Sequence, residues 1–178
     1  MFDVLARIFR TGRLSEAPPV AEAATPEETA LQRELHAVFG RALCIRHVDT
    51  GSCNACELEI QALTNPHYNL TGAGIKFVPS PRHADLLLVT GPVAVNMEEA
   101  LKRAYDAMPE PKWVLAVGDC AAGNCLFGAN YATRGSVRDV IPVDAVVGGC
   151  PPTPFAMLRA ILQVTRQPPR AVAAGAGR

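Results

Sequence analysis

Apolar segments alternate with helical patterns along most of the chain. Five short segments are predominantly apolar, which is typical of strands in a parallel sheet covered on both faces. From Met97 to Met108, apolar residues recur at helical spacing, with Asn96 and Glu99 as expected caps. This alternation predicts an α/β fold with a parallel sheet. The predicted strands are Leu43–Val48, Gly74–Val78, Asp85–Thr90, Trp113–Val117 and Asp144–Val147.

Three further segments carry helical signals. Glu57–Leu63 has a helical pattern, and a final helix is expected over 154–164, where Thr153 precedes a proline in the first helical position. Near the amino end, Thr25 begins a capping-box pattern, and helical spacing then continues as far as Gly40. Helices therefore separate most of the predicted strands.

The two ends of the chain differ from its middle. Residues 1–14 predict an amphipathic helix that docks on a lipid or protein surface, and a frayed terminus is the alternative. Residues 15–25 are rich in Ala, Pro and Glu, which is typical of an extended linker. Residues 167–178 predict a flexible tail, so the folded domain is expected at 26–166. The apolar face of the first helix consists of Phe2, Leu5, Ile8 and Phe9.

Composition narrows the class of protein. With 178 residues, 49% of them hydrophobic and 19% charged, the chain has the size and composition of one globular domain. Its 17 basic and 17 acidic residues cancel, so we expect no nucleic-acid partner. No apolar run reaches the roughly 18 residues that a membrane span requires, and no secretory signal is recognisable, so we expect a cytoplasmic location.

Four of the six cysteines follow predicted strands. Cys53 and Cys56 form a C-x-x-C pair after the first strand, Cys120 follows the strand ending at 117, and Cys150 follows the strand ending at 147. The carboxyl ends of parallel strands meet at the edge where α/β proteins bind ligands. Thiolates are the soft ligands of iron–sulfur clusters, and four of them complete the coordination of a 4Fe–4S centre. The spacing therefore favours a cluster at this edge.

Other interpretations of the cysteines stay open. A single C-x-x-C is also typical of thioredoxin-like redox pairs, and four cysteines also hold structural zinc. Cys125 lies five positions after Cys120 and is the alternative to it as the fourth ligand. Cys44 lies inside the first predicted strand, where we expect it to be simply buried.

Four motifs together resemble one family, over about Leu43 to Leu162. It is the family shared by the small subunits of nickel–iron hydrogenases and the B-type subunit of NADH–quinone oxidoreductase. The spacing of Cys53 and Cys56, and Thr153 in C-P-P-T-P, resemble the energy-converting, membrane-associated hydrogenases, including formate hydrogenlyase-type complexes. The matching motifs are G-S-C-N-A-C-E at Gly51–Glu57, P-S-P-R-H-A-D at Pro79–Asp85, G-D-C at Gly118–Cys120 and G-G-C-P-P-T-P at Gly148–Pro154.

This resemblance implies a flavodoxin-like α/β domain with helices on both faces of its parallel sheet. One 4Fe–4S cluster at the carboxyl ends of the strands would be bound by Cys53, Cys56, Cys120 and Cys150. The chain would relay electrons to a large subunit that carries the nickel–iron site. The other implied partners are a ferredoxin-like iron–sulfur subunit and membrane-arm subunits, on the inner face of the cytoplasmic membrane.

Further residues have two interpretations each. Glu57 resembles a glutamate near the large-subunit interface and is a candidate for a proton path, but a carboxylate is also favourable at a helix start. Arg82 and His83 resemble positions that face partner subunits, and an ordinary solvated loop is the alternative. The helix that begins at Thr153 would direct its positive end toward the cluster.

Two alternative functions remain. In a protein like the B-type subunit of NADH–quinone oxidoreductase, electrons would pass to quinone in a pocket for which Met97 and Gly91–Asn96 are candidate walls. In a zinc-stabilised assembly module, the same fold would carry no electrons and catalyse nothing. The identity of the bound metal separates the second alternative from the other two functions.

Overall fold

A computed structural model describes residues 6, 9–11, 33, 41–126 and 128–167. The predicted helix over 1–14, the linker over 15–25, the helix ending at Gly40 and the tail from 168 lie outside the described residues, apart from these few positions. Residues 6 and 9–11 are helical. The structure therefore bears mainly on the predicted α/β domain.

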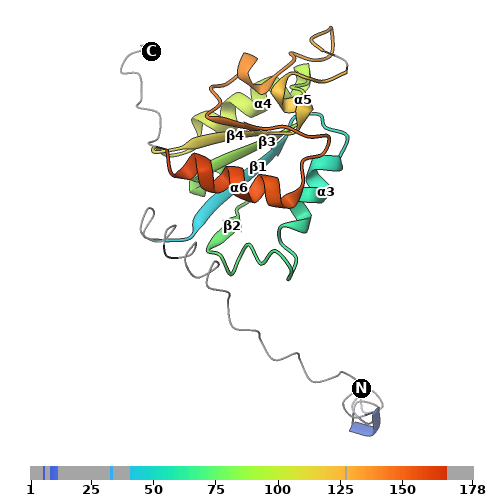
Figure 1. The fold of residues 1–178 in the computed structure, drawn as a ribbon, viewed down its shortest axis with the longest axis vertical. Helices are drawn as coiled ribbons and strands as arrows, with labels where there is room; N and C mark the ends of the chain where they lie inside the picture. Colours follow the sequence, from blue (N-terminus) through green and yellow to red (C-terminus); the bar gives the residue numbers. More distant parts are fainter. Residues whose placement is uncertain (1–5, 7–8, 12–32, 34–40, 127, 168–178) are drawn as a thin grey trace.

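Five parallel strands form one sheet in the order β2-β1-β3-β4-β5 (Figure 1). This order is that of flavodoxin-like doubly wound folds. Each predicted strand is present, with bounds that differ from the prediction by one residue or less at either end. The predicted α/β parallel sheet is therefore confirmed. The strands are β1 Leu43–Asp49, β2 Ile75–Phe77, β3 Leu86–Thr90, β4 Trp113–Val117 and β5 Ala145–Val147.

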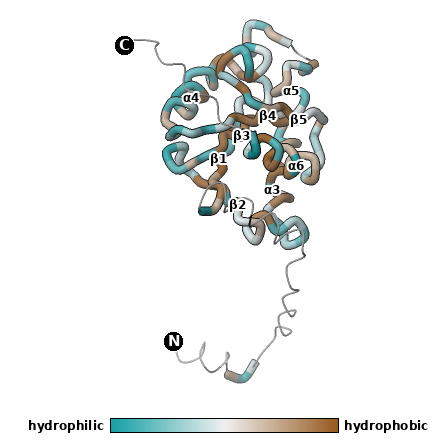
Figure 2. Tube along the Cα trace, turned by 60° about the vertical axis from the view of Figure 1, so that its left-hand side comes forward, coloured by the Kyte–Doolittle hydropathy of each residue, from teal (hydrophilic) through white to brown (hydrophobic). Residues whose placement is uncertain are grey.

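Helices cover both faces of the sheet (Figure 1). On one face, α3 and α6 pack on alternate strand residues such as Leu86 and Leu88, and on the other α4 and α5 pack on Leu87 and Val89. Figure 2 shows hydrophobic segments gathered along the strands inside the domain. The sheet therefore separates two cores. The helices are α3 Ala55–Ala62, α4 Val95–Asp106, α5 Asp119–Ala122 and α6 Pro154–Thr165.

Of the helix caps predicted from the sequence, one is confirmed and one is wrong. Thr153 caps α6 as predicted, because its hydroxyl accepts a hydrogen bond from the amide of Ala156 at 3.3 Å. The predicted cap Asn96 is wrong: the N-cap of α4 is Ala94, two residues earlier, and the helix begins at Val95. The Ala94 amide donates to the carbonyl of Thr50 at 2.8 Å, so a contact with a neighbouring loop sets this helix start.

Carboxylates join neighbouring strands at their amino ends. Asp85 is buried and accepts hydrogen bonds from the Cys44 amide at 2.9 Å and from the Arg41 guanidinium at 2.6 and 3.2 Å. Asp144 accepts from the Val114 amide at 2.8 Å. Among the described residues, no helix is long and apolar enough to cross a membrane. The amino edge of the sheet is thus tied together by side chains, while its carboxyl edge carries the cysteine loops.

Candidate metal centre

Three loops bring the predicted ligands to the carboxyl edge of the sheet. Cys53 lies between β1 and α3, and Cys56 in the first turn of α3. Cys120 lies in α5 directly after β4, and Cys150 between β5 and α6. All six cysteines of the chain are free; Cys53 and Cys150 are exposed, and Cys56 and Cys120 are partly buried. The sequence therefore placed these residues at the correct end of their strands.

The thiols from the three loops affect one another electrostatically. Burial, together with the charges of Glu57, Cys53, Cys150 and Asp119, raises the pKa of Cys56 to about 11. For Cys120, burial, a hydrogen bond with Cys125 and the charges of Cys125, Cys150 and Cys53 together raise the pKa to about 12. Several thiolates at one place repel each other unless a cation neutralises them. These thiols therefore suit a cationic metal centre that takes soft ligands, such as an iron centre.

The backbone around Cys56 leaves no room for an added side chain. Gly118 has a φ of +93°, and a Cβ atom there would lie 2.7 Å from the Cys56 sulfur. Only glycine adopts this conformation without strain while allowing so close an approach.

Within 41–126 and 128–167, no group of three or more His, Cys, Asp or Glu side chains is close enough to hold a single metal ion.

Asp119 joins two of the cysteine loops. Its carboxylate accepts a hydrogen bond from the Gly149 amide at 2.7 Å, and its own amide donates to the Gly149 carbonyl at 2.9 Å. The adjacent Gly118 amide donates to the Val147 carbonyl at 2.8 Å. Cys120 and Cys150 are therefore held in a fixed relation by their neighbours. The sequence did not predict this role: the G-D-C motif includes Asp119 but does not indicate its contact with Gly149.

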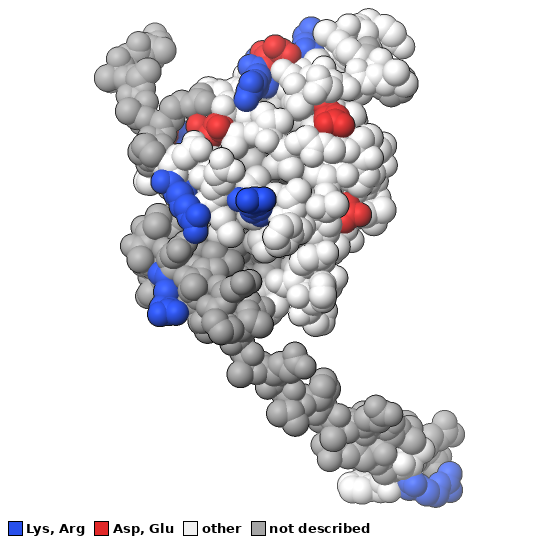
Figure 3. Space-filling view, in the orientation of Figure 1, with Lys and Arg blue, Asp and Glu red and all other residues white. Residues whose placement is uncertain are grey.

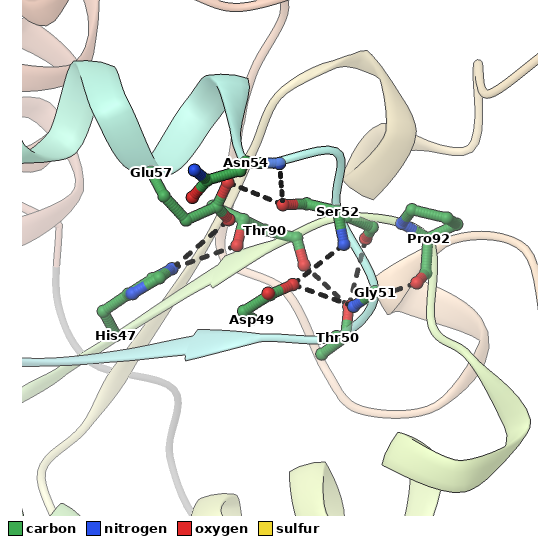
Figure 4. A network of polar contacts seen from close by, with 10 residues as sticks. His47, Asp49, Thr50, Gly51, Ser52, Asn54, Glu57, Thr90 and Pro92 are labelled. Carbon is green, nitrogen blue, oxygen red and sulfur yellow. Dashed lines mark hydrogen bonds and ion pairs between the residues drawn. The ribbon is translucent and has the colours of Figure 1, made fainter.

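Side chains brace the loop that carries Cys53 (Figure 4). The Asp49 carboxylate accepts from the amides of Gly51 and Ser52, both at 2.8 Å. The Ser52 hydroxyl donates to a carboxylate oxygen of Glu57 at 2.6 Å and accepts from the Asn54 amide at 3.1 Å. These bonds fix the loop between β1 and α3 from both ends.

Glu57 is buried between α3 and the sheet. Its side chain is 9% exposed, and its Oε1 atom has no hydrogen-bond partner but lies 3.8 Å from His47 Nε2. The same His47 nitrogen is 3.0 Å from the hydroxyl of Thr90 (Figure 4). Burial lowers the pKa of His47, although Glu57 and Asp49 act in the opposite direction. This contact with His47 had no signal in the sequence.

The remaining predicted residues lie in different places. Arg82 and His83 are exposed in a short 3-10 turn that leads to the amino end of β3, so the structure does not bring them to the cysteine edge. The loop Gly91–Ala94 follows the carboxyl end of β3 and leads into α4, to which Val95 and Asn96 belong. It lies beside Ser52, whose amide nitrogen would be 2.5 Å from a Cβ atom added at Gly91. Cys44 is buried in β1, as expected.

One family model matches the part of the chain that contains most of the sheet and the predicted ligand cysteines. The family model described as NADH ubiquinone oxidoreductase, 20 Kd subunit, matches residues 53–164. This match begins at Cys53, ends within α6 and includes Cys53, Cys56, Cys120 and Cys150. The chain belongs to this family. As a member of the 20 Kd subunit family, it is an oxidoreductase subunit, and the predicted resemblance is confirmed.

Relatives of the chain include subunits named for hydrogenase-type complexes and for NADH-quinone oxidoreductase. A probable membrane-bound hydrogenase subunit mbhJ of Pyrococcus furiosus is 44% identical over 124 residues, 70% of this chain and 74% of the relative. Formate hydrogenlyase subunit 7 of Escherichia coli is 42% identical over 118 residues, 66% of this chain and 46% of the relative. A B-type subunit of NADH-quinone oxidoreductase from Herpetosiphon aurantiacus is 44% identical over 110 residues, 61% of each chain.

A solved structure supports the same fold. The chain resembles a subunit of an archaeal respiratory membrane complex, the membrane-bound sulfane sulfur reductase, with a TM-score of 0.62 and 29% identity. The superposition covers 76% of this chain and 73% of that subunit. The fold of this chain is therefore similar to that of a chain in an archaeal respiratory membrane complex.

Proposed function

We propose that this chain is the electron-transfer subunit of a membrane-associated nickel–iron hydrogenase or formate hydrogenlyase-type complex. The observation that carries the proposal is the convergence of cysteines from three loops on one sheet edge, in a chain 44% identical to a membrane-bound hydrogenase subunit. In this proposal, Cys53, Cys56, Cys120 and Cys150 bind one 4Fe–4S cluster. The catalytic centre lies in a partner subunit.

Membership of the family implies iron–sulfur binding, and a cluster supplies one-electron transfer when bound. The residues of this chain hold and surround it. Four thiolates provide the bonds to iron, and the close approach at Gly118 keeps the turn after β4 against the Cys56 thiol. Asp119 keeps the Cys120 and Cys150 loops together. The amino end of α6, three residues after Cys150, contributes a positive dipole.

The surface near the proposed ligands suits a protein partner. Three large apolar side chains lie within five residues after a cysteine and are exposed: Leu58 at 58%, Leu126 at 94% and Phe155 at 66%. Figure 3 shows that charged side chains are sparse on the face formed by α3 and α6. Exposed apolar side chains in such a setting mark interaction surfaces. We assign this edge to the large subunit, which brings its redox centre near the cluster.

The other partners and the location follow from the same proposal. A ferredoxin-like iron–sulfur subunit exchanges electrons with the cluster, and membrane-arm subunits hold the complex at the inner face of the cytoplasmic membrane. Residues 1–14 serve as the docking helix and 15–25 as its linker to the domain at 26–166. Glu57 braces the Cys53 loop through Ser52, and its role in a proton path stays a prediction.

A second function is favoured by a specific observation. The chain is 44% identical to a B-type subunit of NADH-quinone oxidoreductase, and the loop Gly91–Ala94, which leads into α4, lies at the cysteine edge beside Ser52. A subunit of that type would pass electrons to quinone near this loop. The presence of nickel in the partner distinguishes the two functions.

The test is anaerobic purification of the chain with its partners, followed by measurement of iron, sulfide, nickel and zinc. We expect about four iron and four sulfide per chain, with nickel in a large partner. Iron and sulfide without nickel support the quinone-type function, and zinc alone contradicts both functions.

Substitution of single cysteines tests the ligand assignment in the same purification. Cys150→Ser is expected to abolish or convert the cluster, whereas Cys44→Ser, at a buried position in β1, keeps the iron content. An unchanged iron content in Cys150→Ser overturns the assignment of that ligand.

A further inference from the structure

Backbone amides beside the proposed ligands are bonded within the protein. The Ser52 amide, directly before Cys53, donates to the Asp49 carboxylate at 2.8 Å (Figure 4). The Asn54 amide, directly after Cys53, donates to the Ser52 hydroxyl at 3.1 Å. The N–H groups of both neighbours of this cysteine are therefore not available to another acceptor.

The same arrangement recurs in the other two loops. The Gly149 amide, directly before Cys150, donates to the Asp119 carboxylate at 2.7 Å. The Asp119 amide, directly before Cys120, donates to the Gly149 carbonyl at 2.9 Å. In each loop, the amide that precedes the first cysteine thus has a partner within the chain. In two of the three loops that partner is an aspartate.

The cysteine segments carry negative charge and no basic residue. Within 49–57, 118–125 and 147–155, the acidic residues are Asp49, Glu57 and Asp119, and there is no Lys or Arg. The positive end of α6 acts in the opposite direction with about half a charge. This helix begins with Pro154, which has no amide hydrogen, and its Ala156 amide is bonded to the Thr153 hydroxyl. Three carboxylates therefore outweigh the helix end.

Both features lower the reduction potential of an iron–sulfur cluster. Reduction adds a negative charge, which N–H donors to the cluster sulfurs stabilise and which neighbouring carboxylates oppose. An aspartate that accepts the amide before a ligand acts in both ways, because it takes away a donor and adds a charge. Two of the cysteine loops are built in this way.

We propose that Asp49 and Asp119 hold the cluster of this chain at a low reduction potential, so that its electron donor is a low-potential iron–sulfur protein and its acceptor is not a quinone. This inference rests on the proposed function and deepens it, because it selects the redox partner by class. One electron leaves the reduced iron–sulfur donor, which is oxidised, and reduces the cluster, without transfer of a proton or an atom. Neither aspartate binds the metal; each acts through an amide and a charge beside a cysteine.

A redox titration of the complete complex, purified anaerobically and followed by electron paramagnetic resonance, tests this inference. Asp49→Ala frees the Ser52 amide and removes a charge. At the midpoint potential of the wild type, we expect its ratio of reduced to oxidised cluster to be about tenfold higher, a shift of about 59 mV for one electron. Asp49→Asn and Asp119→Asn each keep an acceptor oxygen and are expected to shift the midpoint in the same direction by less.

Asp144→Asn is the matched control for these variants. Asp144 also accepts a hydrogen bond from a backbone amide, that of Val114 at 2.8 Å, but it lies at the amino edge of the sheet. The midpoint potential is expected to stay at its wild-type value in this variant. Iron content and the shape of the resonance signal, measured on each sample, distinguish a shifted potential from a damaged cluster.

Equal midpoints in the wild type and in the Asp49 and Asp119 variants overturn the inference. So does a shift of the same size in Asp144→Asn, or a wild-type cluster that is half reduced at the potential of a quinone couple. If Asp49→Ala loses its iron, the two Asn variants, which keep the bonds of their loops, decide the question. A wild-type chain that holds no cluster contradicts the proposed function instead.

Discussion

Asp119 illustrates how much of the cysteine edge depends on residues that are not themselves ligands. Its hydrogen bonds to Gly149 join two loops that are 30 positions apart in the sequence. The placement of Cys53, Cys56, Cys120 and Cys150 at the carboxyl edge of the sheet was predictable, because each follows a strand. Asp119 and the pair formed by His47 and Glu57 were not, since no local spacing records a contact made by folding.

Substitution of Asp119 separates its hydrogen bond from its charge. Asp119→Ala leaves the Gly149 amide without its acceptor, which we expect to cost about 1–3 kcal/mol of the free energy of unfolding and to lower iron content. Asp119→Asn keeps an acceptor oxygen and the iron, but removes a negative charge near the cluster and so raises its reduction potential. Urea unfolding and a redox titration followed by electron paramagnetic resonance measure the two effects. Equal potentials in wild type and Asp119→Asn contradict the electrostatic part.

The partly buried imidazole of His47 predicts a loss of stability in acid. Burial lowers its pKa in the folded chain below the usual 6.5, so the unfolded chain binds a proton first as the pH falls. The contribution of His47 to the free energy of unfolding is therefore constant above pH 6.5. It decreases as the pH falls from 6.5 to the folded-state pKa. Urea unfolding as a function of pH measures this slope. His47→Gln is expected to flatten it, and identical slopes in both chains exclude His47 as the cause.

Elements with continuous apolar runs were the most predictable part of the fold. All five strands were predicted correctly, because strands that are buried on both faces have continuous apolar runs in the sequence. The four-residue helix α5 was not predicted, and Asn96 was wrongly chosen as a cap. Both depend on contacts between elements: α5 on the turn at Gly118, and α4 on the hydrogen bond from Ala94 to Thr50.

Two glycines with positive φ allow a matched test of the turn after β4. Gly118→Ala places a Cβ atom 2.7 Å from the Cys56 sulfur, so we expect a loss of more than about 1 kcal/mol in stability and a displaced thiol that lowers iron content. Gly128→Ala also has a positive φ, but nothing lies within 4 Å of its Cβ position. It is expected to lose stability through backbone strain alone and to keep its iron. Iron loss of equal size in both variants contradicts this explanation.

The whole domain rests on two cores that lie on opposite faces of the sheet. Leu115 is completely buried in one of them, whereas Cys53 and Cys150 are exposed. The strand order of the sheet came only from the family resemblance, because apolar runs mark strands without saying which of them are neighbours. The common edge for the cysteines, by contrast, follows from parallel strands in any order.

This division predicts different effects of core and cysteine substitutions on the metal-free chain. Leu115→Ala is expected to lower the free energy of unfolding by about 2–5 kcal/mol, because it leaves a cavity beneath the sheet. Cys53→Ser and Cys150→Ser are expected to change it by about 0.5 kcal/mol or less. Denaturant titration followed by circular dichroism measures these changes. A cysteine variant that unfolds as readily as Leu115→Ala shows that the thiols support the fold.

The separation of the cores from the cysteine edge also bears on how such a subunit is assembled in the cell. A chain that reaches its native shape without its cofactor presents the same docking surfaces to its partners whether it is loaded or empty. An empty copy that is built into the complex occupies a place in it and interrupts the path of electrons. Shape alone does not reveal the defect, so any maturation step that rejects empty copies has to probe the sheet edge itself.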